Sequence, residues 1–312
     1  MELEAADLNL SSIAKYFSDE GEAYALVEAI RWPNGPICPH CGSIDRAYRL
    51  RNQKTRSGKV SQRRLWKCRE CRQQFTCTIG TIFEDSHIPL SKWLLGAFLV
   101  NTGKNGVSVH ELRRSLNISL KAAWFMGHRL RYAMARIPSN QLLSGIVEAD
   151  ETYVGGKQTQ EERRERDNKV PVVTLVQRDG ELRSQVMKPV SGKNIKQVIE
   201  KNVQMGSQLM TDGSTLYDDA GMDYIHQTVD HSREEWVRGN VHVNTAEGFF
   251  SQLKRSIDGT HHHVSERHLH RYVAEFDHRY NSRDLKDGER MMQTIRQTKG
   301  RMLTYREPTR DA

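Results

Sequence analysis

Two Cys-x-x-Cys motifs near the N-terminus constrain this chain more than any other feature. The first motif, CPHCG, holds Cys38 and Cys41, and the second, CRECR, holds Cys68 and Cys71, with 26 residues between the pairs. Two such pairs, each on a tight turn, can close four thiolates tetrahedrally around one Zn²⁺. A module of about 50 residues has little core of its own, so the metal supplies much of its stability. The spacing therefore predicts a zinc ribbon with one structural Zn²⁺.

The residues around these pairs refine the prediction. The segment between them, YRLRNQKTRSGKVSQRRLWKC, alternates as a β-hairpin does and is rich in Lys and Arg, which suits contact with a phosphate backbone. Cys77, the fifth cysteine, is expected to pack in a core, and His40 is expected to be solvated. Redox-active or incidental cysteine pairs are the alternative, which the paired spacing disfavours.

The charge balance indicates a polyanionic partner. Forty-seven Lys and Arg against 39 Asp and Glu give a net charge of +8, and a basic protein gains affinity for nucleic acid as phosphate counterions are released. No run approaches the roughly 18 apolar residues of a membrane span, and the N-terminus lacks the pattern of a secretory signal. We therefore expect no membrane association and a cytoplasmic location.

The chain changes character near residues 33, 85 and 140, so we predict a multidomain α/β protein. The expected parts are a helical lead-in (1–32), the zinc ribbon (33–84), a helical domain (85–140), a larger catalytic domain (141–285), and a C-terminal helix and tail (286–312).

The helical domain has the spacing of a helix-turn-helix. A helix from about Ser91 to Asn101 is followed by a second one with Ser108 as N-cap, and the short break LNIS precedes a third helix. In a helix-turn-helix the last helix lies in a major groove, where it would present Ser119, Lys121, Trp124 or His128. A three-helix bundle used for packing or dimerisation is the alternative.

The larger domain carries strand and helix signals in a definite order. We expect a strand through EADETYVGG, two strands joined by a turn at Arg178-Asp179-Gly180, a helix that Gly206 caps, a strand that breaks after Asp212, a strand in YIHQTVDHS and a final helix. This is the order of the ribonuclease H-like fold, a mixed five-stranded sheet with helices on both faces.

The final helix, in VHVNTAEGFFSQLKRSI, has two different faces. At 100° per residue its apolar side chains fall on one arc and its polar ones on the opposite arc. The apolar arc holds Ala246, Phe249, Phe250, Leu253 and Ile257, and the polar arc holds Asn244, Glu247, Ser251 and Lys254. A solvated surface is the ordinary explanation of such a polar arc; the alternative is that it forms the wall of an active site.

Three acids give that alternative weight. Asp150 lies on the first strand, Asp212 ends the fourth, and Glu247 lies on the polar arc, so the fold would bring them together. Converging carboxylates repel one another and attract divalent cations; Mg²⁺ prefers oxygen ligands, and two such ions can promote phosphoryl transfer. Each acid also has an ordinary explanation. Asp150 could be a charge at a strand edge, and Glu148 and Glu151 are rival candidates for its catalytic role. Asp212 could serve only to form the turn before Gly213.

Several motifs together resemble a known family. CPHC with CREC, EADETYVGGK, MTDGSTLY and HVNTAEGFFSQLKRSIDGTHHHVSERHLHRYVAEFDHRYN, spread over about residues 25–285, resemble the IS1595 family of transposases with its ISXO2-like catalytic domain. The resemblance implies a DDE-type transposase of a bacterial insertion sequence, with Asp150, Asp212 and the NTAEG segment as the catalytic set. Members carry Asn or Glu in the third position. We expect Glu247 there, because a carboxylate adds charge toward Mg²⁺, with Asn244 assisting and Lys254 holding a DNA phosphate.

The resemblance also implies cofactors, partners and a reaction. Two Mg²⁺ ions, with Mn²⁺ as a substitute, would activate the water that hydrolyses the phosphodiester bond at the element's end, and the freed 3′-hydroxyl would attack target DNA. The partners would be double-stranded DNA, as terminal inverted repeats and as target, and a second copy of the chain in a homodimer or higher oligomer. The location would be the nucleoid of a bacterial cytoplasm. Expected DNA contacts are Lys121, Trp124, His128, Lys254, Arg255 and His262.

Two rival functions remain open on the sequence. One is a non-catalytic DNA-binding protein derived from a transposase, and the other is a stand-alone metal-dependent nuclease of the same fold. Cleavage and strand-transfer products would separate the three.

Overall fold

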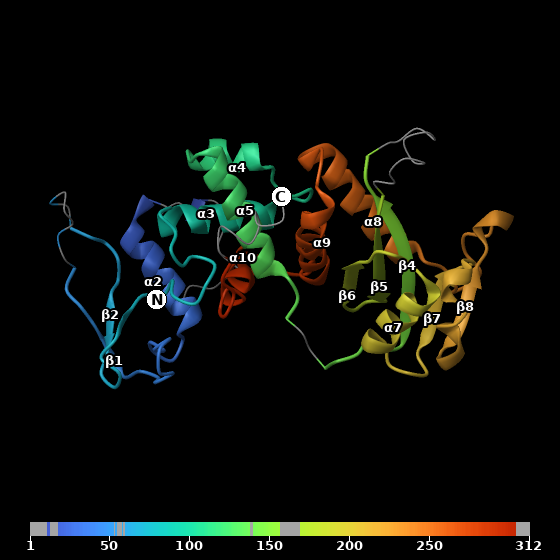
Figure 1. The fold of residues 1–312 in the computed structure, drawn as a ribbon, viewed down its shortest axis with the longest axis horizontal. Helices are drawn as coiled ribbons and strands as arrows, with labels where there is room; N and C mark the ends of the chain where they lie inside the picture. The colour runs from blue at the N-terminus through green and yellow to red at the C-terminus, as the bar shows by residue number, and fades with distance from the viewer. Residues whose placement is uncertain are drawn as a thin grey trace. The chain divides into compact units, whose positions relative to one another are not determined.

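The chain forms two compact units (Figure 1), each described here by itself. The structure, a computed structural model, describes residues 11–12, 18–52, 54, 58, 60–137, 140–156 and 169–303. The structure leaves out most of the predicted lead-in before residue 18 and part of the predicted hairpin between residues 53 and 59. It also leaves out residues 157–168, between the first two predicted strands, and the tail after residue 303. The N-terminal unit comprises Met1–Met134 and Asp284–Ala312, and the sheet unit comprises Ala135–Arg283.

The N-terminal unit combines a small sheet with helices. In chain order its elements are α2 (Glu20–Arg31), β1 (Ala47–Arg49), β2 (Trp66–Cys68), β3 (Gln74–Phe75), α3 (Leu90–Thr102), α4 (Val109–Leu116), α5 (Leu120–Met134) and α10 (Asp287–Arg296). The three strands pair antiparallel in the order β1-β2-β3. Asp19 begins α2 by accepting hydrogen bonds from the backbone N–H groups of Gly21 and Glu22, as an N-cap does.

One hydrophobic core joins the small sheet to the helices of this unit. Trp32, just after α2, meets Trp66 and Phe75 edge-on at ring-centroid distances of 6.3 and 5.7 Å. The buried carboxylate of Glu28 on α2 accepts hydrogen bonds from Arg64 Nε at 2.6 Å and from Trp66 Nε1 at 2.7 Å. The cysteine-bearing segment is therefore fixed to a helix by aromatic packing and by a paired buried charge.

The break between α4 and α5 follows from local side-chain chemistry. Ser108 accepts a hydrogen bond from the N–H of Glu111, so the predicted N-cap is confirmed. Asn117 ends α4 in the left-handed region, at φ 47°, and Ser119 then caps the start of α5 through the N–H of Ala122. Much of α5 is buried, including Arg129, whose guanidinium donates to the carbonyl oxygens of Ile82 and Glu84.

The sheet unit is built on a mixed five-stranded sheet, as predicted. Its strands are β4 (Ile146–Val154), β5 (Val170–Gln177), β6 (Leu182–Val186), β7 (Gln208–Asp212) and β8 (Ile225–Val229), in the spatial order β6-β5-β4-β7-β8. The pairs β6-β5 and β5-β4 are antiparallel, while β4-β7 and β7-β8 are parallel. Short 3₁₀ turns lie at Thr215–Tyr217 (η2), Gly221–Asp223 (η3) and His231–Arg233 (η4).

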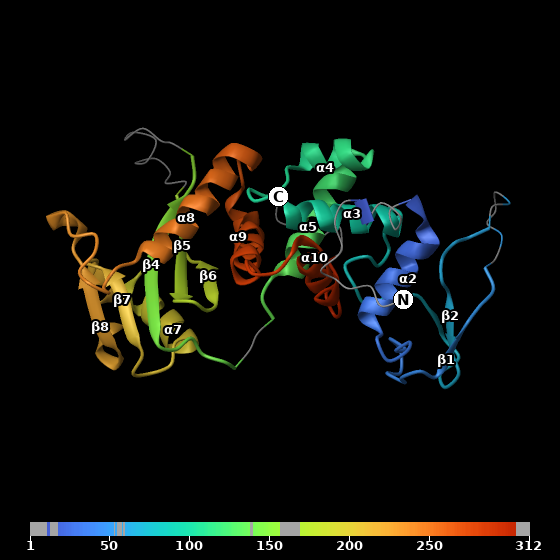
Figure 2. The same cartoon turned by 180° about the vertical axis from the view of Figure 1, so that it is seen from behind.

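Helices cover both faces of this sheet (Figures 1 and 2). One face packs Val147 and Ala149 of β4 against α7 (Gly192–Asn202). The other packs Val172 and Val176 of β5 against α8 (Asn244–Ser256) and α9 (Glu266–Asn281), with a π-helical turn, η5 (Ile257–His261), between them. Because β5 is covered on both sides, its sequence VPVVTLVQ is almost uniformly buried.

The edge strand β6 is closed by α9. Asp277 Oδ2 accepts a hydrogen bond from the N–H of Ser184 at 2.8 Å, and Asn281 both accepts from the N–H and donates to the carbonyl of Leu182. These bonds occupy backbone groups that an open edge would offer to another strand.

Among the described helices, none combines the length and apolar content that a membrane span needs.

One predicted boundary is wrong. The helix expected to run to Gly206 ends at Asn202, because Val203 adopts extended backbone and pairs with Leu143. Gly206, at φ 80°, instead supplies the left-handed turn into β7.

Candidate metal centres

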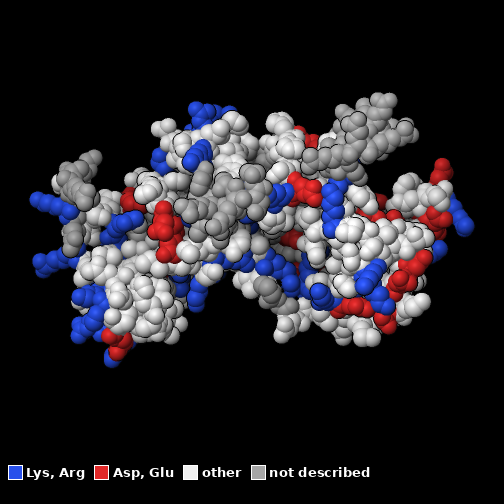
Figure 3. Space-filling model, in the orientation of Figure 1, with Lys and Arg blue, Asp and Glu red and all other residues white. Residues whose placement is uncertain are grey.

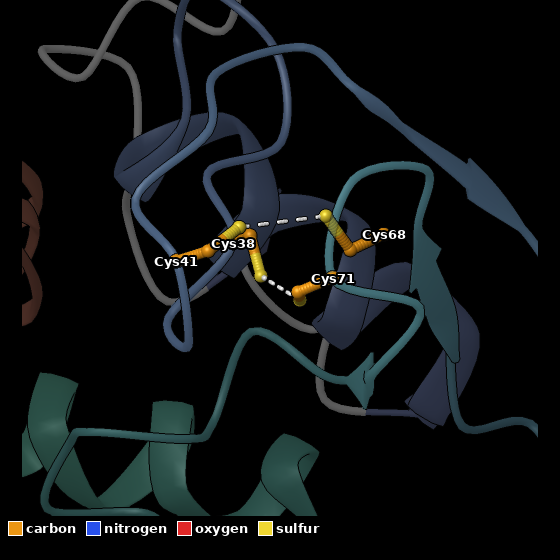
Figure 4. Close-up of side chains that lie close together, drawn as sticks. All are labelled: Cys38, Cys41, Cys68 and Cys71. Carbon is orange, nitrogen blue, oxygen red and sulfur yellow. Dashed lines mark hydrogen bonds between the residues drawn. The ribbon is translucent and has the colours of Figure 1, made fainter.

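Four cysteines of the N-terminal unit form a compact cluster (Figure 4). Their sulfur atoms all lie within 4.8 Å of one another. The Sγ atoms of Cys38 and Cys71 are 3.6 Å apart, and those of Cys41 and Cys68 are 3.7 Å apart. Zn–S bonds of ~2.3 Å in a tetrahedron require sulfur separations of about 3.8 Å. The four thiols therefore fit one structural Zn²⁺.

Two backbone turns present these thiols. In the first, the N–H of Gly42 donates to the carbonyl of Cys38, and in the second the N–H of Cys68 donates to the carbonyl of Gln73. Gly42 at φ 75° and Arg72 at φ 63° supply the left-handed residue that each turn needs. The local sequence thus builds both halves of the site.

Ser43 is a polar neighbour that sequence reasoning missed. Its Oγ lies 3.3 Å from the Sγ atoms of both Cys41 and Cys68. The hydrogen bond from this hydroxyl lowers the pKa of the Cys68 thiol to about 6, and the pKa of Cys41 also falls, through the same hydroxyl first. Thiolate is the form that binds metal, so Ser43 favours the ligating state.

The two other residues near this site do not belong to the cluster. Cys77 is fully buried, and burial raises the pKa of its thiol, as for a packing cysteine. His40 is exposed, and its Nε2 lies 3.3 Å from the carbonyl oxygen of Gln74.

Strand register brings two of the predicted acids together in the sheet unit. The parallel pairing of β4 with β7 matches Glu148 to Met210. Two residues further along each strand stand Asp150 and Asp212, at the carboxyl end of β7. Paired strands are about 4.8 Å apart, and residues two apart share a face. Both aspartates therefore lie side by side where β7 ends, midway along β4.

Helix α8 brings the third acid to them. Its predicted apolar residues are all buried, among them Phe249, Phe250 and Leu253, and its predicted polar arc faces outward, with Asn244, Ser251 and Lys254 exposed and Glu247 half-buried. The raised pKa of Asp150 indicates that the three acids lie near one another. This pKa rises to about 8 through burial first and then through the charges of Asp212, Glu151 and Glu247. Asp150 is thus within electrostatic reach of both other predicted acids.

This cluster is more open than the cysteine site. Among the described residues, the four cysteines are the one group of three or more whose ligand atoms are gathered tightly enough to hold an ion as they stand. The acids offer only oxygen donors, and the charges of Asp212 and Glu247 raise the pKa of Asp150, so their chemistry fits a hard divalent cation such as Mg²⁺ better than Zn²⁺.

The two rivals of Asp150 have other partners. Glu148 is fully buried and pairs with Arg178, with 2.7 Å between Glu148 Oε1 and Arg178 Nε. Glu151 accepts a hydrogen bond of 2.6 Å from the hydroxyl of the buried Tyr217, and burial is the main cause that raises its pKa. The contact between Glu151 and Tyr217 joins β4 to η2, and no periodic pattern in the sequence signals it.

The predicted DNA contacts divide by exposure. Lys121, Lys254, Arg255 and His262 are exposed. Trp124 is half-buried and packs on His128, with the ring centroids 4.2 Å apart, and His128 is 1% exposed. Because α5 runs through the core of the N-terminal unit, His128 is not at the surface where the prediction put it, and we withdraw it as a DNA contact.

Basic side chains also gather around the small sheet. Several Lys and Arg side chains project from the β1–β2 end of the N-terminal unit in Figure 3. The exposed ones in this segment are Arg46, Arg49, Arg51, Lys54, Arg63, Arg69 and Arg72.

Comparisons with known proteins identify a domain in each of the two units. Residues 18–74 match the transposase zinc-ribbon domain, and residues 142–281 match the ISXO2-like transposase domain. The chain is 31% identical over 308 residues to an uncharacterised protein in the transposable element ISH50 of Halobacterium salinarum, a match that covers 91% of this chain and 98% of that protein. By these matches and the cysteine cluster that the zinc-ribbon domain requires, the chain belongs to the IS1595 family of transposases.

Proposed function

We propose that this transposase is a DDE-type enzyme that cuts DNA at the ends of its element and joins the freed 3′-hydroxyl to target DNA. The observation that carries the proposal is the strand register that brings Asp150 beside Asp212, with Glu247 of α8 close enough that its charge also raises the pKa of Asp150. Further support comes from the strand order β6-β5-β4-β7-β8 with helices on both faces, which is the arrangement expected of a ribonuclease H-like domain.

The three acids would hold Mg²⁺, with Mn²⁺ as a substitute. When bound, a pair of such ions supplies activation of a water molecule and stabilisation of the leaving oxygen in a phosphoryl displacement. Glu247 is our choice over Asn244 for the third position, because Glu247 acts on the ionisation of Asp150 and a carboxylate contributes charge that an amide lacks. Asn244, one turn earlier on the same arc, would assist in orienting the DNA.

Cations on α8 would hold the DNA. Lys254 lies on the same arc as Glu247, two turns further along, and is exposed together with Arg255. Both would bind backbone phosphates next to the acids, and so orient the scissile bond. His262, exposed in the segment after α8, would contact the same duplex.

The N-terminal unit would recognise the DNA ends of the element. The exposed arginines around the small sheet suit phosphate contact, and α4 with α5 would act as a helix-turn-helix that presents Lys121 near the start of its second helix. On this proposal residues 33–84 and 85–140 form the two DNA-binding parts, and 141–285 the catalytic part. Because both ends of an element are cut together, we propose at least a dimer on DNA.

Substitution of the aspartates tests the activity. Asp150→Asn and Asp212→Asn should each lower Mg²⁺-dependent cleavage of an oligonucleotide bearing the element's end by at least about a thousandfold, since losing a ligand removes several kcal/mol of transition-state stabilisation. Binding to the same oligonucleotide should stay within about twofold. Asp219→Asn, at an exposed acid beyond β7, is the matched control and should cleave normally.

Three outcomes would count against the proposal. Undiminished cleavage by Asp150→Asn would defeat the assignment of the acids. Binding by the unaltered protein without any cleavage would support the non-catalytic DNA-binding alternative. Cleavage without strand-transfer products, when target DNA is supplied, would support a stand-alone nuclease.

A further inference from the structure

Glu148 is a fully buried carboxylate that the proposed chemistry does not use. It lies on β4 two residues before Asp150, so both side chains share one face of the strand. Its Oε2 accepts hydrogen bonds from the backbone N–H groups of Thr245 at 2.8 Å and Ala246 at 3.1 Å. Its Oε1 accepts from the Thr245 hydroxyl at 3.0 Å and from Arg178 Nε at 2.7 Å. Both oxygens are therefore occupied by protein donors.

Three of those four donors, two of them backbone N–H groups, belong to the first turn of α8, which lacks a side-chain N-cap of its own. Val243 stands at the N-cap position, and its side chain has no oxygen that could accept a hydrogen bond from the first turn. The first N–H groups of a helix need acceptors, and a negative charge at that end is favourable. Glu148 supplies both from a strand that lies about a hundred residues earlier in the chain.

Arg178 extends the same contact to the loop before α8. It stands in the turn after β5 and is 14% exposed. Beyond Glu148, it donates to the carbonyl and side-chain oxygens of Asn240 at 2.8 Å each, and to the carbonyl of His242 at 2.9 Å. The guanidinium thus neutralises Glu148 and fixes the residues that lead into the helix.

These contacts tie together the backbone segments that carry two of the proposed metal ligands. Glu148 is two residues from Asp150, and Thr245, which it binds, is two residues from Glu247. A shift of the first turn of α8 would change the distance between Glu247 and Asp150 directly. We infer that Glu148 and Arg178 are positioning residues that set the spacing of the carboxylates and thereby the affinity for divalent cations. The inference rests on the proposed function, because it concerns how the proposed ligands are held.

Cation binding without DNA tests the inference apart from activity. The full-length, zinc-loaded protein is titrated with Mn²⁺, and free Mn²⁺ is measured by electron paramagnetic resonance. Glu148→Gln keeps the shape of the side chain and removes its charge, and should raise the Mn²⁺ dissociation constant by at least about tenfold, the usual effect of removing a group that orients a metal ligand. In cleavage assays, the Mg²⁺ concentration at half-maximal rate should rise in parallel, with partial recovery at saturating metal.

Further variants separate positioning from stability. Thr245→Val removes one hydrogen bond to Glu148 and leaves the backbone bonds in place, so it should fold and raise the Mn²⁺ dissociation constant by a few-fold. The control Glu266→Gln breaks an exposed ion pair of the same unit, between Lys188 and Glu266, and should bind Mn²⁺ normally. A folded Glu148→Gln variant with unaltered Mn²⁺ affinity would overturn the inference. If that variant does not fold, unaltered affinity in Thr245→Val would overturn it.

The same titration distinguishes failure of the proposed function. Asp150→Asn should lose Mn²⁺ binding altogether. If it binds Mn²⁺ as the unaltered protein does, the proposed carboxylate site is wrong, and the inference falls with it. If Asp150→Asn loses binding while Glu148→Gln and Thr245→Val do not, the site stands and only the positioning role is lost.

Discussion

The N-terminal unit gathers four cysteines from two short turns, whereas the sheet unit gathers three acids from two strands and a helix far apart in sequence. In the first centre the thiols already stand at separations that suit one ion. In the second, the charges of Asp212 and Glu247 oppose the ionisation of Asp150, and the surrounding sheet and helix hold the three acids near each other. The two centres therefore differ in their effect on stability. A bound metal stabilises the fold around the cysteines, whereas the fold holds the acids together although their negative charges repel.

The contrast predicts opposite results when a ligand is removed from each centre. At the cysteine centre, Cys68→Ser should reduce the zinc content from one ion per chain to none and make residues 33–84 sensitive to protease. Structural zinc contributes apparent binding free energies on the order of 10–16 kcal/mol, which a small module cannot replace. Metal analysis and limited proteolysis measure both effects. Cys77→Ala, at the buried cysteine outside the cluster, should keep its zinc. Retention of one tightly bound zinc by Cys68→Ser would contradict the assignment.

Features that depend on short sequence patterns were predictable. The spacing of the cysteine pairs, the N-cap at Ser108 and the two faces of α8 are each encoded within a few residues, and the structure has all three. The five-stranded sheet was predictable too, because the order of strands and helices leaves few arrangements. The grouping of Asp150 with Asp212 follows from that order together with the strand register.

Features that depend on partners distant in sequence were not predictable. Nothing near Glu148 shows that it caps α8, since its backbone partners lie about a hundred residues away. The exposure of His128 was misjudged because α5 buries polar residues as well as apolar ones: Arg129 and Arg131 are inside the same core. A buried arginine that bonds to carbonyl groups has the same sequence signature as an exposed one.

Asp277, another buried acid of the sheet unit, has a raised pKa outside the proposed carboxylate site. Burial raises the pKa of Asp277 on α9 to about 7. The folded protein therefore binds a proton that the unfolded chain releases near pH 4, so stability falls as pH rises from about 4 to about 7. Asp277→Asn removes this dependence. Between pH 5 and pH 8, the unfolding free energy should shift in favour of the variant by about 2 to 3 kcal/mol.

Urea unfolding at the two pH values measures this shift, and divalent cations should not alter it, because Asp277 bonds to the backbone of β6 and is not one of the proposed metal ligands. Asp219→Asn, at an exposed acid of the same unit, should leave the pH dependence as it is. An identical pH dependence in Asp277→Asn and the unaltered protein would show that this carboxyl does not titrate between pH 5 and pH 8.

The smallest effect is expected at Ser43. This residue supports the cysteine ligands without binding the metal itself, the role that we propose for Glu148 beside the acids. Its hydroxyl lies 3.3 Å from two of the four sulfurs and favours their thiolate forms. Ser43→Ala should therefore weaken zinc binding by about tenfold without loss of the fold, since groups that support a metal ligand typically contribute 10–100-fold in affinity. Competition with a chromophoric chelator measures the change, with Ser115→Ala, at an exposed serine of α4, as the control. Unaltered zinc affinity would mean that the backbone turns alone hold the thiolates, and that supporting side chains matter only where the ligands repel one another.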